Sequence, residues 1–207
     1  MKLVHYHAPH SRSFAVLWLF EELGYTAPHE MKVLNLKKGE HKSPGYLAVN
    51  PMGKVPAIRH GDTVVTEIAA IAIYLSDYFS EAGLAPKAGD PARGPYLRWM
   101  VFNHAAVEPA VTDRALKREP GPASTLAYGT YDDTVNALAG ALRPGPFILG
   151  DRFSAADVVV GASVRWLVTF KLLPERPEFT DYIARLSARP ALQRAIAKDA
   201  ELAAAQA

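Results

Sequence analysis

The stretch KLVHYHAPHSRSFAVLWLFEELG, residues 2–24, predicts a short strand that turns directly into a helix. Residues 2–7 are strand-like, and after a polar turn the large apolar residues recur at helical spacing: Phe14, Leu17, Phe20 and Leu23. Gly24 follows, where a glycine often ends a helix. A second strand-like run spans residues 31–36. A strand, helix and strand joined at this length predict a βαβ unit with parallel strands.

The following residues predict a β-hairpin and a second helix. A polar turn at residues 37–44 comes first, and the strand-like runs 55–59 and 63–65 then flank a Gly-Asp turn. A helix is expected over residues 67–79, with one apolar face: Ile68, Ile71, Ala72, Leu75 and Phe79. Residues 1–80 are therefore expected to fold as βαβ followed by ββα.

The rest of the chain is helical in pattern. Residues 81–92 are rich in Gly, Pro and Ala and carry no periodicity, so we interpret them as a linker. Residues 93–207 then contain the predicted helices, at about 93–116, 123–142, 155–168, 178–188 and 190–204. The expected fold class is an α/β domain followed by an all-α domain.

One helix start in this second part carries a specific signature. Ser154 and Asp157 have the spacing of a capping box, and Phe153 and Val158 occupy the two positions of a hydrophobic staple. This pattern predicts that a buried helix begins at Ala155. Its role is in folding rather than in catalysis.

Composition excludes several classes of protein. The chain has 207 residues and a net charge of +2, so it offers no basic field for nucleic acid. No apolar run reaches the roughly 18 residues that a membrane helix needs, and the first residues are strand-like rather than a signal peptide. The chain contains no Cys, which excludes disulfides, thiolate metal sites and cysteine nucleophiles. We expect a cytoplasmic protein.

The turn between the first strand and the first helix is a candidate site. A helix N-terminus favours an anion, and a hydroxyl of Ser11 or Ser13 can add a directed hydrogen bond. The alternative is that one of these serines simply caps the helix. His5 and His7 lie on one face of the strand, which allows a metal site. Without Cys or an adjacent carboxylate, plain strand histidines are favoured and no metal is expected.

Pro56, at the start of a strand, and Glu67, at the start of a helix, are two further candidate positions. Pro56 stands at the start of a strand, and a cis peptide after Val55 would turn the Val55 amide and carbonyl towards a peptide-like ligand. The alternative is a trans proline on an edge strand. Glu67 lies in the first turn of a predicted helix, where the helix dipole favours an acidic side chain. The functional alternative is that Glu67 accepts hydrogen bonds from an ammonium group.

Taken in order, the motifs of the chain resemble those of the cytosolic glutathione transferase superfamily, and most closely its phi- and theta-like branches. The motifs are Ser11-Arg12-Ser13, Gly39-Glu40-His41-Lys42-Ser43-Pro44, Asn50-Pro51-x-Gly53-x-Val55-Pro56-Ala57, Thr66-Glu67-x-Ala69-x-Ile71, Phe153-Ser154-Ala155-Ala156-Asp157 and Arg189-Pro190-Ala191. The resemblance implies a thioredoxin-like N-terminal domain that binds glutathione, an all-helical C-terminal domain and a homodimer.

The resemblance also implies which residues bind glutathione. The backbone of Val55, before Pro56, would pair with the cysteinyl part, and Glu67 would receive the γ-glutamyl ammonium. The glycyl carboxylate would meet a basic group: His41, Lys42 and Lys54. The backbone N–H of Ile68 would meet the glutamyl carboxylate. Because the family usually has Ser at that position, we expect weaker glutathione binding.

The residue that activates the thiol is Ser11 or His10, depending on the register of the first helix, with Ser13 third. The thiolate would attack a small hydrophobic electrophile, in a pocket formed by one helix face: Trp99, Phe102, Asn103 and Ala106. Core packing is the alternative for that face. The implied activity is conjugation, since without Cys only the ligand carries a thiol. The alternatives are a non-catalytic stress or ligand-binding protein, or a glutathione-dependent dehalogenase, isomerase or peroxidase.

Overall fold

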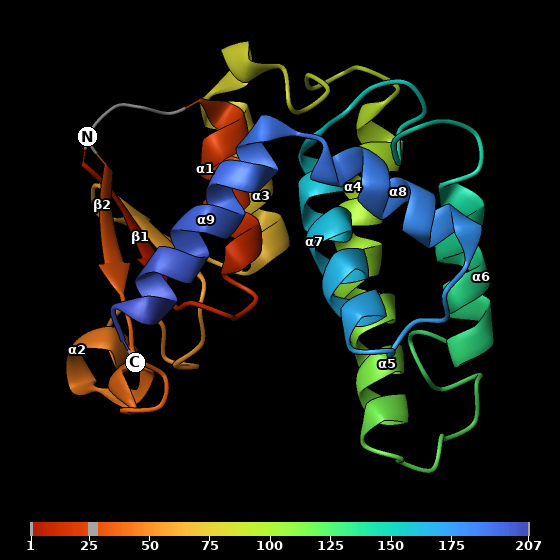
Figure 1. Cartoon of the computed structure of the whole chain (residues 1–207), viewed down its shortest axis with the longest axis horizontal. Coiled ribbons are helices and arrows are strands. Elements are labelled where there is room, and N and C mark those ends of the chain that lie inside the picture. The colour runs from red at the N-terminus through yellow and green to blue at the C-terminus, as the bar shows by residue number, and fades with distance from the viewer. Residues whose placement is uncertain (1, 25–28, 207) are drawn as a thin grey trace. The chain divides into compact units, whose positions relative to one another are not determined.

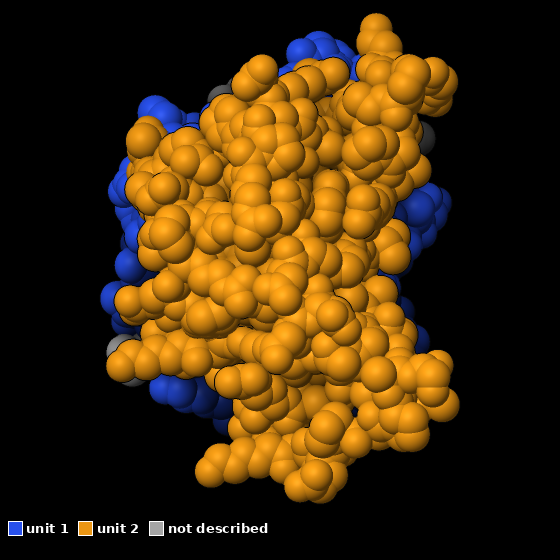
Figure 2. Space-filling view, turned by 90° about the vertical axis from the view of Figure 1, so that its right-hand side faces the viewer, with its two compact units in different colours: residues 1–82, 189–207 blue, residues 83–188 orange. Residues whose placement is uncertain are grey.

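The computed structural model describes residues 2–24 and 29–206, which form two compact units. The first unit comprises Met1–Ala82 and Arg189–Ala207, and the second comprises Gly83–Ala188. Figure 1 traces the chain, and Figure 2 shows the surface of the second unit in orange. Each unit is described below by itself.

A four-stranded mixed sheet forms the centre of the first unit. Its strands lie in the order β2-β1-β3-β4, with the bounds β1 Leu3–His7, β2 His29–Val33, β3 Ala57–His60 and β4 Thr63–Thr66. β1 and β2 are parallel, and the other two pairings are antiparallel. The predicted βαβ unit and hairpin are confirmed, as is the helix α1, Phe14–Leu23, which ends at a left-handed Gly24.

The second strand lies earlier than the predicted 31–36. It ends at Val33 because Asn35 begins a polar turn that uses the backbone hydrogen-bonding groups locally. The Asn35 N–H donates to Glu40 Oε2 at 2.7 Å, and the Lys38 N–H donates to Asn35 Oδ1 at 3.0 Å. The turn leads into a short 3₁₀ helix, η1 (Glu40–Lys42), and then into α2 (Pro44–Leu47).

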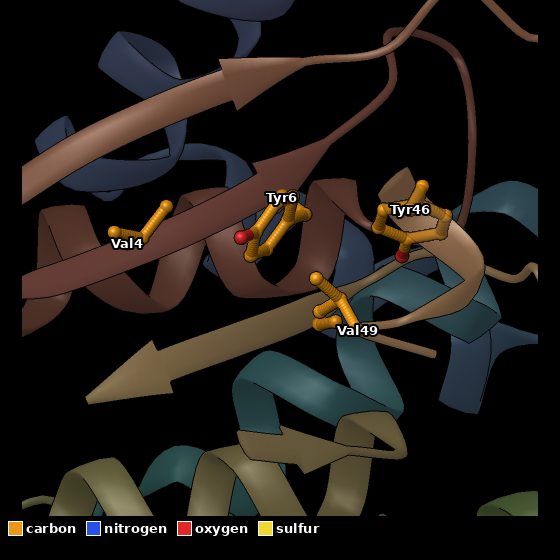
Figure 3. Close-up of a cluster of buried hydrophobic side chains, with 5 residues drawn as sticks. Val4, Tyr6, Tyr46 and Val49 are labelled. Carbon is orange, nitrogen blue, oxygen red and sulfur yellow. The ribbon is translucent and has the colours of Figure 1, made fainter. Parts of the chain in front are cut away.

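β1 is covered on both faces, and all five of its residues are buried. On one face Val4 and Tyr6 pack with Tyr46 and Val49, which follow η1 (Figure 3). On the other face the ring of His5 lies 5.3 Å from that of Phe20 in α1. Because side chains alternate across a strand, double coverage leaves each of the strand's histidines inside the protein.

The last helix belongs to the first unit. α9 (Pro190–Ala204) packs along α1 (Figure 1), and Arg189 makes a bidentate pair with Glu22, with both distances 2.7 Å. Arg194 Nε donates to Glu21 Oε2 at 2.6 Å. The helix α3 (Ile68–Tyr78) also packs on α1. The sequence pattern instead predicts a helical domain that continues to residue 207.

The second unit is built from helices, with two isolated β-bridges in the loop that precedes Ala155. Its helices are α4 Arg93–Phe102, α5 Glu108–Ala115, α6 Tyr131–Ala141, α7 Ala155–Thr169 and α8 Pro177–Ser187. The thioredoxin-like sheet followed by helices therefore confirms the predicted fold class. A 3₁₀ turn, η2 (Ser80–Ala82), precedes this unit. No helix among the described residues is long and apolar enough to span a membrane.

Two helix predictions in this unit need correction. The helix expected over 93–116 is interrupted by a π turn, η3 (Asn103–Val107), because Pro109 has no N–H to donate within the helix. The helix expected over 123–142 begins only at Tyr131, where the Thr130 hydroxyl caps it by accepting the Asp133 N–H at 3.0 Å.

The start of α7 confirms the capping box. Ser154 Oγ accepts the Ala156 N–H at 3.2 Å, and Asp157 Oδ2 accepts the Ser154 N–H at 2.9 Å. Asp157 is fully buried, and it also accepts the Ile148 N–H at 2.8 Å and the Tyr182 hydroxyl at 2.9 Å. Burial raises the pKa of Asp157, while these hydrogen bonds oppose the rise.

We expect Asp157→Ala to lower the free energy of unfolding by about 3 kcal/mol, because it leaves buried donors unpaired and removes the cap. Urea denaturation measures the change. Asp132→Ala is the matched control, since Asp132 is an exposed acid in the first turn of α6, and it should cost less than about 0.5 kcal/mol. Equal losses in the two variants would contradict the role given to Asp157.

Candidate active site

The strand register brings the predicted site segments to one edge of the sheet. Tyr6 pairs with Ala57, and Ala57 pairs with Thr66. The turn that follows β1, the residues that precede β3 and the residue that follows β4 are therefore neighbours. The Val55-Pro56 peptide, directly before β3, is cis, as one of the two alternatives predicts.

The turn between β1 and α1 is held together by its two serines. Ser11 Oγ donates to the Ala8 carbonyl at 2.7 Å and lies 2.8 Å from Ser13 Oγ. Ser13 Oγ accepts the Ala8 N–H at 3.0 Å. Ser13 occupies the N-cap position of α1, yet its side chain makes no capping bond. The Ser13 hydroxyl thus faces back towards the strand and does not cap α1, whereas Ser11 Oγ accepts the Ser13 N–H at 3.2 Å and helps to close the turn before the helix.

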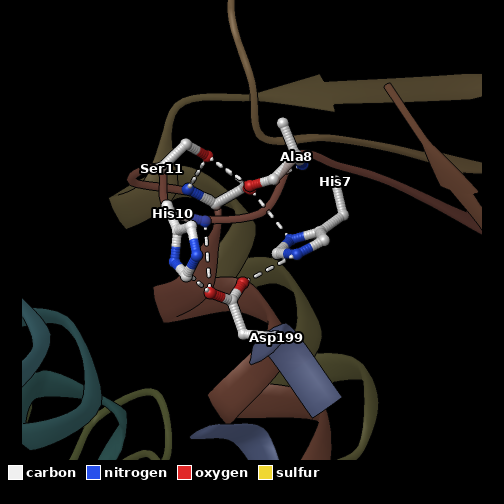
Figure 4. A network of polar contacts seen from close by, with 6 residues as sticks. His7, Ala8, His10, Ser11 and Asp199 are labelled. Carbon is white, nitrogen blue, oxygen red and sulfur yellow. Dashed lines mark hydrogen bonds and ion pairs between the residues drawn. The ribbon is translucent and has the colours of Figure 1, made fainter. Parts of the chain in front are cut away.

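A histidine and an aspartate extend this group into the protein (Figure 4). Ser13 Oγ lies 2.9 Å from His7 Nδ1, and His7 Nε2 lies 3.0 Å from Asp199 Oδ1. The His10 N–H donates to Asp199 Oδ2 at 3.1 Å, and His10 Nδ1 lies 3.3 Å from the same oxygen. His7 and Ser13 are fully buried, Ser11 is partly buried, and the His10 side chain is mostly exposed.

Sequence reasoning did not identify Asp199. Burial raises the pKa of its carboxyl group, but its contacts with His7 and with the His10 N–H outweigh burial and bring the pKa below the usual value. A signal was present in α9, where the buried face consists of Ala191, Leu192, Ala195 and Asp199. An acid on the apolar stripe of an amphipathic helix indicates a buried partner.

His5 is a buried histidine that packs against other rings. Its ring is fully buried between Phe20 and His7, at centroid distances of 5.3 and 5.5 Å. Burial, followed by the charges of His7 and His29, lowers its pKa well below the usual value. Within residues 2–24 and 29–206, no group of three or more His, Asp or Glu side chains is placed to hold a metal ion.

The basic residues predicted to bind a carboxylate lie on two adjoining turns. Lys42 Nζ donates to the Met52 carbonyl at 2.9 Å, which joins η1 to the loop before Pro56. The Lys54 carbonyl accepts the Tyr46 hydroxyl at 2.5 Å and Asn50 Nδ2 at 2.8 Å. These bonds fix the backbone of the loop. The side chain of Lys54 is left exposed.

Glu67 is held in an unusual backbone conformation. It has φ +67° and ψ 123°, at the N-cap position of α3, and its side chain is exposed and makes no capping bond. A non-glycine residue in this region costs about 1–3 kcal/mol, and such residues are concentrated at functional sites. Ile68, which follows, is 8% exposed, so its side chain belongs to the core.

Family models match both parts of the chain. The glutathione S-transferase N-terminal domain matches residues 11–77, and the glutathione S-transferase C-terminal domain matches residues 109–197. The chain belongs to the cytosolic glutathione transferase superfamily. The N-terminal match includes both serines, the cis proline and Glu67.

Individual relatives support the same family. Glutathione S-transferase A of Pleuronectes platessa is 28% identical over 188 residues, which cover 86% of this chain and 83% of the relative. A glutathione transferase from Methylococcus capsulatus is 28% identical with a TM-score of 0.80, covering 96% of this chain and 98% of the other. A Sulfitobacter homologue solved with bound glutathione is 28% identical with a TM-score of 0.75, covering 95% and 98%.

The residues predicted to line a transferase electrophile pocket divide into two pairs. Phe102 and Ala106 line an open, mainly apolar groove of about 640 Å³ in the second unit. Trp99 and Asn103 are buried and do not line this groove. Asn103 Nδ2 donates to Ser163 Oγ at 2.9 Å, and the Trp99 ring meets the Phe102 ring edge-on at 5.3 Å. The core-packing alternative therefore describes Trp99 and Asn103.

We expect Gly53→Ala to disrupt the turn that carries His41 and Lys42. A Cβ at Gly53, where φ is +59°, would lie 2.7 Å from the His41 carbonyl oxygen, so the variant should lose about 2 kcal/mol of stability. Gly39→Ala is the control, because Gly39 has φ +73° and an added Cβ meets nothing within 4 Å. Thermal unfolding compares the variants, and an equal loss in both would show that backbone conformation alone matters.

Proposed function

We propose that this protein conjugates the thiolate of glutathione to small hydrophobic electrophiles, as a homodimer in the cytoplasm. The observation that carries the proposal is the meeting of Ser11, the cis Val55-Pro56 peptide and the strained Glu67 at one edge of the sheet. A related Sulfitobacter protein was solved with bound glutathione. Family membership supports this activity over a stress or ligand-binding role.

In the proposed complex, each end of the tripeptide meets a complementary group. The Glu67 carboxylate accepts hydrogen bonds from the γ-glutamyl ammonium, and the backbone of Val55, preceding Pro56, pairs with the cysteinyl residue. The first turn of α3, from Ile68, lacks a side-chain cap and favours the glutamyl carboxylate. The glycyl carboxylate meets the basic turns that hold His41, Lys42 and Lys54.

The thiol lies at the start of α1. A free thiol has a pKa of about 8.5 and is mostly protonated at neutral pH. Lowering that pKa by about two units requires about 2.7 kcal/mol of preferential stabilisation of the thiolate. A hydroxyl donor together with the helix dipole at the N-terminus of α1 supplies interactions of this size. Ser11 is partly buried and Ser13 fully buried, so Ser11 is the proposed donor, His10 being the second candidate.

The electrophile is proposed to bind on the face of α4 and η3, where Phe102 and Ala106 line the groove. The buried residues Trp99 and Asn103 would pack beneath the residues that line the groove. Since the chain has no Cys, it cannot form a mixed disulfide with glutathione. This favours conjugation over thiol–disulfide exchange.

We expect Ser11→Ala to lower kcat/KM by about 10²-fold with little change in glutathione affinity, because it removes a donor to the thiolate. Conjugation of glutathione to a chloronitroarene measures the rate, and ultraviolet absorbance of bound thiolate measures its pKa. His10→Ala is the matched comparison, and a larger loss there would assign the role to His10. If the unmodified protein neither turns over nor is retained on immobilised glutathione, the proposed function is wrong.

We expect Glu67→Gly to stabilise the fold and weaken glutathione binding in the same molecule. Glycine relieves the positive φ, which should raise the free energy of unfolding by about 1 kcal/mol. Loss of the charged acceptor should weaken glutathione binding by about tenfold or more. Glu67→Gln separates the effects, since it removes the charge but keeps the strain. Calorimetry measures both quantities, and unchanged affinity in the two variants would contradict the assignment.

A further inference from the structure

We propose that the thiol proton of glutathione passes through Ser11 and Ser13 to His7, and that Asp199 holds His7 ready to receive it. This inference rests on the proposed function and adds to it the destination of the proton. Ser11 would touch the thiol. His7 and Asp199 act through other residues and are positioning residues.

The relay is a continuous chain of contacts from the surface into the core (Figure 4). Ser11 Oγ lies 2.8 Å from Ser13 Oγ, Ser13 Oγ lies 2.9 Å from His7 Nδ1, and His7 Nε2 lies 3.0 Å from Asp199 Oδ1. Solvent exposure decreases from Ser11 to His7: Ser11 is partly buried, whereas Ser13 and His7 are fully buried. The chain therefore connects a ligand-accessible hydroxyl with a base that water does not reach directly.

The direction of the hydrogen bonds follows from the aspartate. An ionised carboxylate only accepts, so a neutral His7 is more stable with its hydrogen on Nε2, the nitrogen that lies 3.0 Å from Asp199 Oδ1. Nδ1 is then bare and accepts the Ser13 hydroxyl hydrogen. Ser13 Oγ already accepts the Ala8 N–H at 3.0 Å, and it can also accept the hydrogen of Ser11. Every hydroxyl in this arrangement points towards the base.

Proton transfer reverses the direction of the hydrogen bonds along this chain, and one hydrogen moves at each step. The thiol gives its proton to Ser11 Oγ, the former Ser11 hydrogen moves to Ser13 Oγ, and the former Ser13 hydrogen moves to His7 Nδ1. The products are a thiolate and an imidazolium, and each serine again carries one hydrogen. Ser11 now donates to the sulfur, and the imidazolium lies against the Asp199 carboxylate.

The Ala8 carbonyl is the competing acceptor. It lies 2.7 Å from Ser11 Oγ and 3.0 Å from Ser13 Oγ, so either hydroxyl can donate to it. This carbonyl gives the Ser11 hydrogen an acceptor while no ligand is bound. After proton transfer, Ser13 donates to Ser11 or to this carbonyl, and the Ser11 hydrogen is available for the sulfur.

Other charged groups near His7 do not replace Asp199. His5, beside it on β1, is held neutral by burial, and His10 contacts the other carboxylate oxygen. Ionisable groups on the elements packed around β1 have partners of their own, among them His29 stacked on Phe20, His60 bonded to Tyr74, Glu21 paired with Arg194, Glu22 paired with Arg189, and Glu30 paired with Lys2. Among the described residues, Asp199 is the carboxylate in contact with His7.

Asp199→Asn tests the relay with almost no change in shape. The His10 N–H requires an oxygen at the Oδ2 position, so the amide NH₂ must face His7 Nε2. His7 would then carry its hydrogen on Nδ1 and could not accept from Ser13. Glutathione bound to this variant should have its thiol pKa raised by about one unit or more. At neutral pH kcat/KM should fall by about 10²-fold, while the difference should nearly vanish above about pH 9.5, where free thiol ionises unaided.

The controls separate this role from a structural one. Glu201→Gln makes the same chemical change on the exposed side of α9 and should leave thiol pKa, rate and stability unchanged. If Asp199→Asn fails to fold, His7→Asn serves instead, since its amide oxygen can accept from Ser13 but cannot hold the proton. An equal loss of rate at every pH, or a bound-thiol pKa equal to that of the unmodified protein, would overturn the relay.

The absorbance measurement keeps the two proposals distinct. If the unmodified protein ionises bound glutathione but conjugates nothing, the transferase proposal fails and the thiol pKa still tests the relay. If it ionises glutathione and Asp199→Asn does so equally well, the relay fails and the transferase proposal stands. If glutathione does not bind at all, both proposals are overturned.

Discussion

The burial of β1 on both faces is the constraint on which the first unit depends. A strand with the sequence Leu-Val-His-Tyr-His places two imidazoles where water cannot solvate them. His5 meets this constraint by staying neutral and packing against aromatic rings, and His7 meets it with polar partners on both sides. Those partners come from the turn after the strand and from Asp199, near the other end of the chain. The position of α9 against α1 is therefore tied to the chemistry of β1.

The same edge of the sheet gathers features that stabilise neither the sheet nor the helices. α1 and α3 both begin without a side-chain cap, and His10 and Glu67 both have positive φ. By contrast, α7 in the second unit begins with a complete capping box around Asp157. The N-terminus of α3 therefore presents N–H groups without a side-chain cap beside the strained Glu67, whereas the first N–H groups of α1 donate to the carbonyls of Ser11, Arg12 and Ser13. Ile68 fits this contrast, because its side chain packs in the core while its backbone remains at the edge.

Local patterns in the sequence were enough to predict the sheet and most helices, because strand alternation, the Gly-Asp turn and the capping box act over a few residues. The catalytic candidate Ser11 and the glutathione-binding candidate Glu67 were recognisable for the same reason. Asp199 was not, since its partners His7 and His10 precede it by 192 and 189 residues, beyond the reach of any local pattern. The facing of Trp99 and Asn103 was equally undetermined, because helical spacing shows that residues share a face but not what the face meets. The π turn Asn103–Val107 also changes which residues share a helix face, since it departs from regular α-helical spacing.

The absence of cysteine gives the serine–histidine–aspartate chain its significance. A protein with its own reactive thiol can use that sulfur directly, whereas this chain has none and must manage the proton of a ligand's thiol. A single hydroxyl can stabilise the thiolate but cannot absorb the proton, because it donates one hydrogen and receives another. A base is needed behind it, and a base that is fully buried exchanges protons through hydrogen-bonded neighbours rather than through water. Ser13 joins Ser11 to such a base, and the acid on the buried face of α9 explains how an imidazolium could be held there.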